Sequence, residues 1–163
     1  MAPDLGQEED PMDWIYAHLV VNHFPIVLAS VASAAALVAA VSGREGAWRY
    51  SVVTGLLAAL AAPVAFLTGK QAEDVAESLP GLAEEAIERH EQWGLYALIA
   101  LLVAGVLAVV ALVRKSTRMR WLFAIGIWAA TATTGLTALH GGDIEHDPAA
   151  RGEPAAKPEA LGD

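Results

Sequence analysis

Histidine is the residue type in this sequence best suited to chemistry, and its five copies are unevenly placed. His18 and His23 lie near the start of one long apolar run, and His90 stands shortly before another. His140 lies at the end of the last apolar run, and His146 follows just beyond it. A neutral imidazole keeps one nitrogen lone pair free, and that lone pair binds haem iron or a metal ion such as zinc or copper. The chemistry therefore depends on whether the fold brings these side chains together.

Four long uncharged runs are the strongest structural signal: residues 14–43, 50–69, 92–113 and 121–142. A bilayer core about 30 Å thick is crossed by about 20 apolar residues of α-helix. The chain is also 55% hydrophobic. We therefore predict an all-α integral membrane protein, an up-down four-helix transmembrane bundle. Its spans are expected at about 23–42, 50–69, 92–113 and 121–140.

The remaining segments complete the predicted domain organisation. An acidic N-terminal tail covers residues 1–13, the membrane domain covers 14–146, and a flexible tail rich in Pro, Ala and Gly covers 147–163. Residues 14–22 are interpreted as an interfacial lead-in to the first span, with one long helix kinked at Pro25 as the alternative. Residues 82–91 have helical spacing and predict an outer helix that continues into the third span.

Basic residues predict the orientation of the bundle. Arg44 and Arg49 lie between the first two spans, and four cations at 114–120 lie between the last two. Short basic loops stay on the cytoplasmic side. Both termini are then periplasmic, and the protein is predicted to be a multi-pass protein of the bacterial inner membrane. The net charge of −9 argues against a nucleic-acid partner.

Alternating helix directions place all five histidines at the outer end of the bundle. His23, His90 and His140 are the first candidates for binding a cofactor. His18 lies about 140° around a continuous helix from His23, so the two would be equivalent ligands only if the helix breaks between them. Lys70, at the end of the second span, is a candidate partner for a haem propionate, or else extends to the membrane interface.

Three functions remain open from these residues. The first is electron transfer by a b-type cytochrome, in which haem b near the outer leaflet exchanges electrons with a quinol or a periplasmic electron carrier. The second is a cofactor-free accessory or structural subunit of a respiratory or photosynthetic complex. The third is an outer-face site for a divalent metal, with His23, His90, His140 and His146 as ligands. No hydrolase or phosphate-loop motif is present, so a stand-alone enzyme is disfavoured.

Several of these residues also form a recurring pattern. A histidine, four residues and then His-Phe-Pro-Ile run from His18 to Ile26, and TGKQAED follows the second span. His90 opens the third span, and GGDIEHD follows the fourth. Over residues 14–147 the chain resembles a bacterial family of four-span membrane domains of unknown function (type 2231). The resemblance implies a redox setting, because relatives are sometimes fused to Rieske or c-type cytochrome domains, and it implies b-haem.

Overall fold

The computed structural model describes residues 11–78 and 84–146. These residues form five α-helices and no β-strand: α1 (Pro11–Val21), α2 (His23–Ser42), α3 (Glu45–Glu77), α4 (Glu84–Arg114) and α5 (Thr117–His146). Four helical segments are long and apolar enough to cross a membrane: Asp13–Ser42, Glu45–Glu77, Glu84–Arg114 and Thr117–Ile144. The prediction of an all-α bundle with four potential membrane spans is confirmed. Most of the two predicted tails, and residues 82 and 83 of the predicted outer helix, lie outside the described residues.

The first span combines features of both alternatives from the sequence analysis. It has two helical segments, as the interfacial lead-in predicted, but their hydrogen bonding is nearly continuous, as in one long helix. A single residue, Asn22, separates α1 from α2, and its N–H still donates to the His18 carbonyl at 2.9 Å, as in a continuous helix. Pro25 lies in the first turn of α2, where a helix needs no N–H donor. At the other end of α2, Gly43 adopts a left-handed conformation with φ 66°, and its N–H donates to the Ala39 carbonyl. This glycine cap ends the helix.

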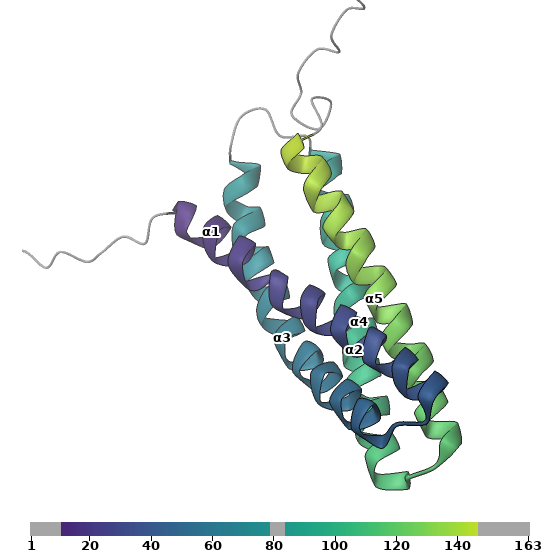
Figure 1. The fold of residues 1–163 in the computed structure, drawn as a ribbon. Helices are drawn as coiled ribbons and strands as arrows, with labels where there is room; N and C mark the ends of the chain where they lie inside the picture. Colours follow the sequence, from purple (N-terminus) through teal and green to yellow (C-terminus); the bar gives the residue numbers. More distant parts are fainter. Residues whose placement is uncertain (1–10, 79–83, 147–163) are drawn as a thin grey trace, which may run out of the picture.

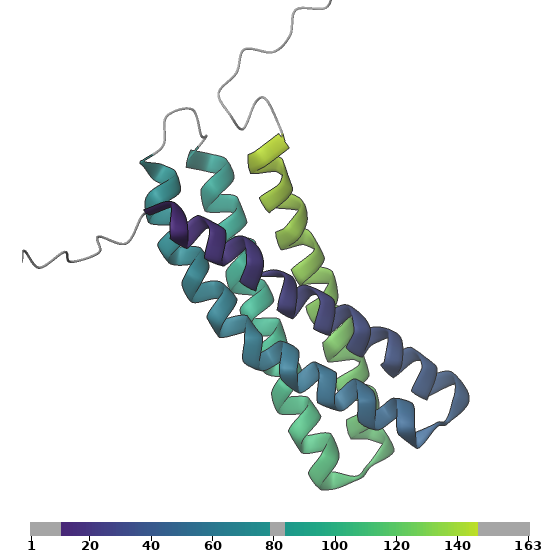
Figure 2. The ribbon, with the colours of Figure 1, turned by 60° about the vertical axis from the view of Figure 1, so that its left-hand side comes forward.

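The helices form an antiparallel bundle closed on all four sides (Figure 1). In it α2 packs against α3, α3 against α4, α4 against α5, and α5 against α2, while α1 packs mainly on α3. Figure 2 shows both short loops, at residues 43–44 and 115–116, at one end of the bundle. We call this the basic end. The start of α1, the end of α3, the start of α4 and the end of α5 lie at the opposite end, which we call the histidine end.

Large and small side chains share the core. The largest fully buried side chains, Phe123, Leu101, Ile127 and Val52, pack among many buried alanines. Many Leu, Val and Ile side chains point outward instead, as expected for surfaces that face lipid. A Cβ built on Gly105 would lie 2.7 Å from the Ala59 Cβ, so α3 and α4 approach very closely at this position. Small residues permit such contacts between membrane helices.

The chain forms two helical hairpins, the first made of α1–α3 and the second of α4 and α5, and an ion pair joins them at the basic end. Arg120 at the start of α5 donates to the Glu45 carboxylate at the start of α3, at 2.9 Å. The same guanidinium lies 5.0 Å from the centre of the Trp48 ring, in cation–π contact. Trp48 in turn meets Phe123 edge to face, with ring centres 5.5 Å apart. The basic end is therefore held together by side chains of both hairpins.

Candidate functional site

Two imidazoles from different helices meet at the histidine end. The ring centres of His18, on α1, and His90, on α4, are 6.3 Å apart, with an angle of 76° between the ring planes. Both side chains are half-buried. No other described histidines are in ring contact with each other. We call His18 and His90 the imidazole pair.

Each ring of the imidazole pair is held by a hydrogen bond to a backbone carbonyl of a neighbouring helix. His18 Nδ1 lies 3.1 Å from the Ala65 carbonyl oxygen on α3. His90 Nδ1 lies 3.0 Å from the Thr137 carbonyl oxygen on α5. A carbonyl oxygen only accepts hydrogen bonds, so Nδ1 must carry the proton in each ring. Nε2 then keeps its lone pair, which is the usual arrangement of a histidine that ligates a metal.

Two glycines make room for the rings. A Cβ built on Gly69 would lie 3.0 Å from Cε1 of His18, and one built on Gly141 would lie 2.9 Å from Cε1 of His90. Any larger residue at either position would push the ring away from its carbonyl. Each imidazole therefore depends on one carbonyl and one glycine of the helix beside it.

The other candidate histidines have different surroundings. His23 is exposed, and its Nδ1 contacts the Leu19 carbonyl one turn earlier, at 2.6 Å. His140 stacks on the Trp93 ring with centres 5.9 Å apart, and its Nδ1 lies 3.5 Å from a carboxylate oxygen of Asp143. Neither ring is in stacking or edge contact with the imidazole pair. The side chain of His146, another predicted metal ligand, lies outside the described part of the chain.

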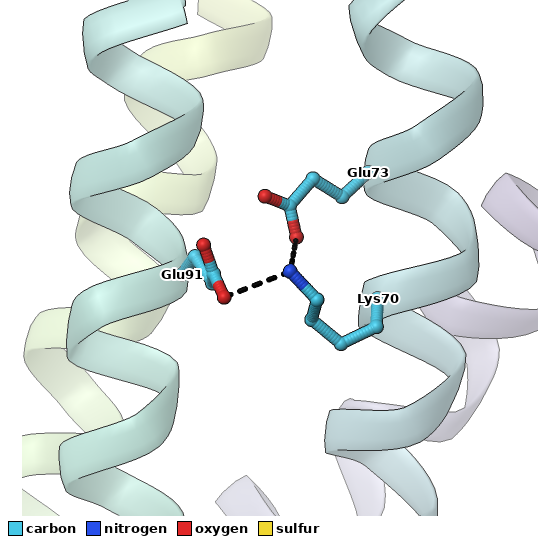
Figure 3. Close-up of polar contacts among 3 residues, drawn as sticks. All are labelled: Lys70, Glu73 and Glu91. Carbon is cyan, nitrogen blue, oxygen red and sulfur yellow. Dashed lines mark hydrogen bonds and ion pairs between the residues drawn. The ribbon is translucent and has the colours of Figure 1, made fainter.

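Lys70 lies in an ionic cluster between α3 and α4 (Figure 3). Its ammonium group donates to Glu73 on the same helix at 2.7 Å and to Glu91 on α4 at 2.8 Å. The Glu73 side chain is only 13% exposed, whereas the other two are 40% and 37% exposed. Lys70 follows Gly69 and Glu91 follows His90 in the chain. The cluster thus joins the two helices next to the imidazole pair, and a haem propionate would compete with two carboxylates for the lysine.

The sequence analysis named His23, His90 and His140 as the first candidates without saying which of them pair, and the structure places His18, not His23, beside His90. The reason is helix phase. With only one non-helical residue between α1 and α2, His18 and His23 remain on different sides, and the side that faces α3 and α4 is the one that carries His18. Glu91 and Trp93 were not singled out as site residues. Their positions one and three residues after His90 were the available signal.

The described residues differ in how well they suit the two proposed ligands. Within residues 11–78 and 84–146, no three or more His, Cys, Asp or Glu side chains are grouped so that they could hold a metal ion. Two imidazoles from facing helices, each with Nδ1 protonated and Nε2 able to bind a metal, are instead a donor set that would suit haem iron. Comparisons with models of known protein families, with curated proteins and with solved structures find no match for this chain. The resemblance to a four-span membrane family stays a prediction.

Proposed function

We propose that this protein is a b-type cytochrome-like electron-transfer protein that binds haem b at the histidine end, where His18 and His90 would hold the iron. The observation that carries the proposal is the imidazole pair: two rings on facing helices, 6.3 Å apart, each with Nδ1 directed to a backbone carbonyl. Haem iron supplies reversible one-electron chemistry when bound. The protein's own part is to present two Nε2 lone pairs in fixed orientations.

The orientation and partners of the protein follow from charge. The short loops at the basic end carry Arg and Lys, and such loops stay in the cytoplasm. We therefore place both termini and the imidazole pair on the periplasmic side of a bacterial inner membrane. Electrons would then move along the outer leaflet, between a quinol and a periplasmic carrier or within a larger redox complex.

A visible spectrum of the full-length protein tests this function. The protein is expressed in haem-replete cells, purified in detergent, and measured before and after reduction with dithionite. Haem with two histidine ligands gives a sharp α band that appears on reduction. We expect this band in the wild type and in a His23→Ala control, and we expect its loss in His90→Ala. A colourless wild-type protein, or an unchanged band in His90→Ala, would refute the assignment.

A cofactor-free accessory subunit is the second candidate, and one observation favours it. Both rings of the imidazole pair already have a hydrogen-bond partner and a close glycine contact, which is sufficient for a purely structural role. A colourless, metal-free preparation that copurifies with subunits of a respiratory or photosynthetic complex would support this alternative. A colourless protein with one bound divalent metal per chain would support the metal-binding function instead.

A further inference from the structure

The two halves of the chain correspond at a constant shift of 72 residues. This shift takes the end of α2 at Ser42 to the end of α4 at Arg114, and the start of α3 at Glu45 to the start of α5 at Thr117. It also takes Gly43, with φ 66°, to Lys115, with φ 49°. Lys115 is the one described non-glycine residue with positive φ. Both hairpins therefore turn at equivalent positions with the same unusual backbone conformation.

Buried positions obey the same shift. Five buried residues of α2 correspond to five of α4, and four of α3 correspond to four of α5. These pairs are Pro25 with Ala97, Ala29 with Leu101, Ala32 with Ala104, Ser33 with Gly105, Ala36 with Ala108, Ser51 with Phe123, Gly55 with Ile127, Ala58 with Ala130, and Ala62 with Thr134. Because the two halves bury equivalent faces, they pack in the same way.

Contacts between the halves come in related pairs too. Gly105 on α4 closely approaches Ala59 on α3. The shift relates these two residues to Ser33 on α2 and Thr131 on α5, whose hydroxyl oxygens are 2.7 Å apart. The first is a close contact made possible by a glycine and the second is a hydrogen bond, but the two occur at equivalent positions of the bundle. The two hairpins also run in the same direction, so a rotation of half a turn about the bundle axis relates them.

The imidazole pair shows the correspondence most closely. The shift takes His18 to His90, Ala65 to Thr137, and Gly69 to Gly141. His18 contacts the Ala65 carbonyl and packs on Gly69, and His90 contacts the Thr137 carbonyl and packs on Gly141. The distances to the carbonyls, 3.1 and 3.0 Å, agree within 0.1 Å. Each hairpin thus builds the same half-site.

We infer that the chain consists of two tandem copies of one helical hairpin, and that these copies form a single ligand site on their pseudo-two-fold axis. The site would take one haem, with His18 and His90 as its two equivalent ligands. This inference rests on the proposed function for the identity of the ligand. It adds that one ligand is bound per chain and that the two hairpins contribute equally.

The two half-sites meet at the imidazole pair. The rings of His18 and His90 lie edge to face, with centres 6.3 Å apart and 76° between their planes.

Titration of the purified full-length protein with haemin tests the stoichiometry and the equivalence. We expect one haemin per chain, and an affinity lowered about tenfold or more in both His18→Ala and His90→Ala. The two losses should agree within about threefold, whereas the matched controls His23→Ala and His140→Ala should bind like the wild type. Two haemins per chain, or wild-type affinity in either His18→Ala or His90→Ala, would overturn the inference.

A measurement without ligand separates this inference from the haem proposal. Gly69→Ala and Gly141→Ala should lower the midpoint of thermal unfolding equally, because each added methyl group meets the same ring atom at nearly the same distance. Gly135→Ala, where a Cβ meets nothing within 4 Å, is the control and should not lower it. Equal losses without haemin uptake would remove the haem proposal and keep the equivalent half-sites. Unequal losses would refute the equivalence even if haemin binds.

Discussion

The close approach of α3 and α4 at Gly105 makes a quantitative prediction about the contact between the two hairpins. In Gly105→Ala the new Cβ would lie 2.7 Å from the Ala59 Cβ. Ordinary carbon–carbon contacts are about 3.5–4.0 Å, so α3 and α4 must separate by about 1 Å. Overpacking of this kind costs about 1–3 kcal/mol. Replacing glycine by alanine within a helix stabilises the helix by about 1 kcal/mol, which offsets part of this cost.

Gly135→Ala isolates the packing cost. Gly135 is also inside a helix, but it lies on the exposed face of α5, and a Cβ built there meets nothing within 4 Å. Both substitutions gain the same helix propensity, so their difference reports the overpacking alone. We expect Gly105→Ala to be less stable than Gly135→Ala by about 1–3 kcal/mol.

Equilibrium unfolding of the purified protein in mixed detergent micelles, with increasing SDS, measures this difference. Far-UV circular dichroism and intrinsic tryptophan fluorescence should give the same midpoint for each variant. If Gly105→Ala proved as stable as Gly135→Ala, then α3 and α4 would not be in close contact, and the packing described for the bundle would be wrong.

Three further predictions concern the polar contacts and the orientation. Ser33→Ala removes hydrogen bonds to a carbonyl and a hydroxyl of α5 and should cost about 0.6 kcal/mol in SDS unfolding, at most about 2. Ser30→Ala, whose hydroxyl bonds only within its own helix, should cost less. Lys70→Met leaves two carboxylates without their cation and should cost about 1 kcal/mol at neutral pH. The stability that Lys70→Met loses relative to the wild type should become smaller as the pH falls, because protonation of either carboxylate removes the repulsion between them. A pH series of unfolding midpoints for both proteins checks this. In this cysteine-free chain, Asp13→Cys should react with a membrane-impermeant maleimide in cells with a permeabilised outer membrane, and Thr117→Cys only after lysis; the reverse pattern would invert the proposed orientation.

The helices could be read from the sequence because each is specified locally. Long uncharged runs identify four spans, since a helix in lipid must be apolar over the thickness of the bilayer. Gly43 marks the end of the first span, and Glu84 and Glu85 suit the first turn of α4. The outer helix expected before the third span appears as the first turns of α4, from Glu84. The second helix, however, extends beyond its predicted span through residues 70–77, because a hydropathy pattern ends where charge begins, whereas helical hydrogen bonding continues into the polar segment.

The site was only partly predictable. The gathering of histidines at one end follows from the alternating directions of the helices, which the sequence specifies. The choice of His18 over His23 does not, because it depends on how α1 rotates against α3 across the one-residue break at Asn22. The spacing of 72 residues between His18 and His90, and between Gly69 and Gly141, was present in the sequence. It acquires meaning only when the two hairpins are seen to make the same contacts.

The sequence by itself determined an all-helical chain with four helices long and apolar enough to cross a membrane, short basic loops at one end and the histidines at the other. These are properties of single segments, set by hydropathy, charge and chain direction. Only the tertiary structure decided which imidazoles meet and which backbone carbonyls accept a hydrogen bond from each Nδ1–H. It also decided that Lys70 joins two helices by pairing with a glutamate on each. Such contacts depend on the rotation and spacing of helices about one another. Close packing across the bundle sets both, through residues such as Gly105 that carry no chemistry themselves.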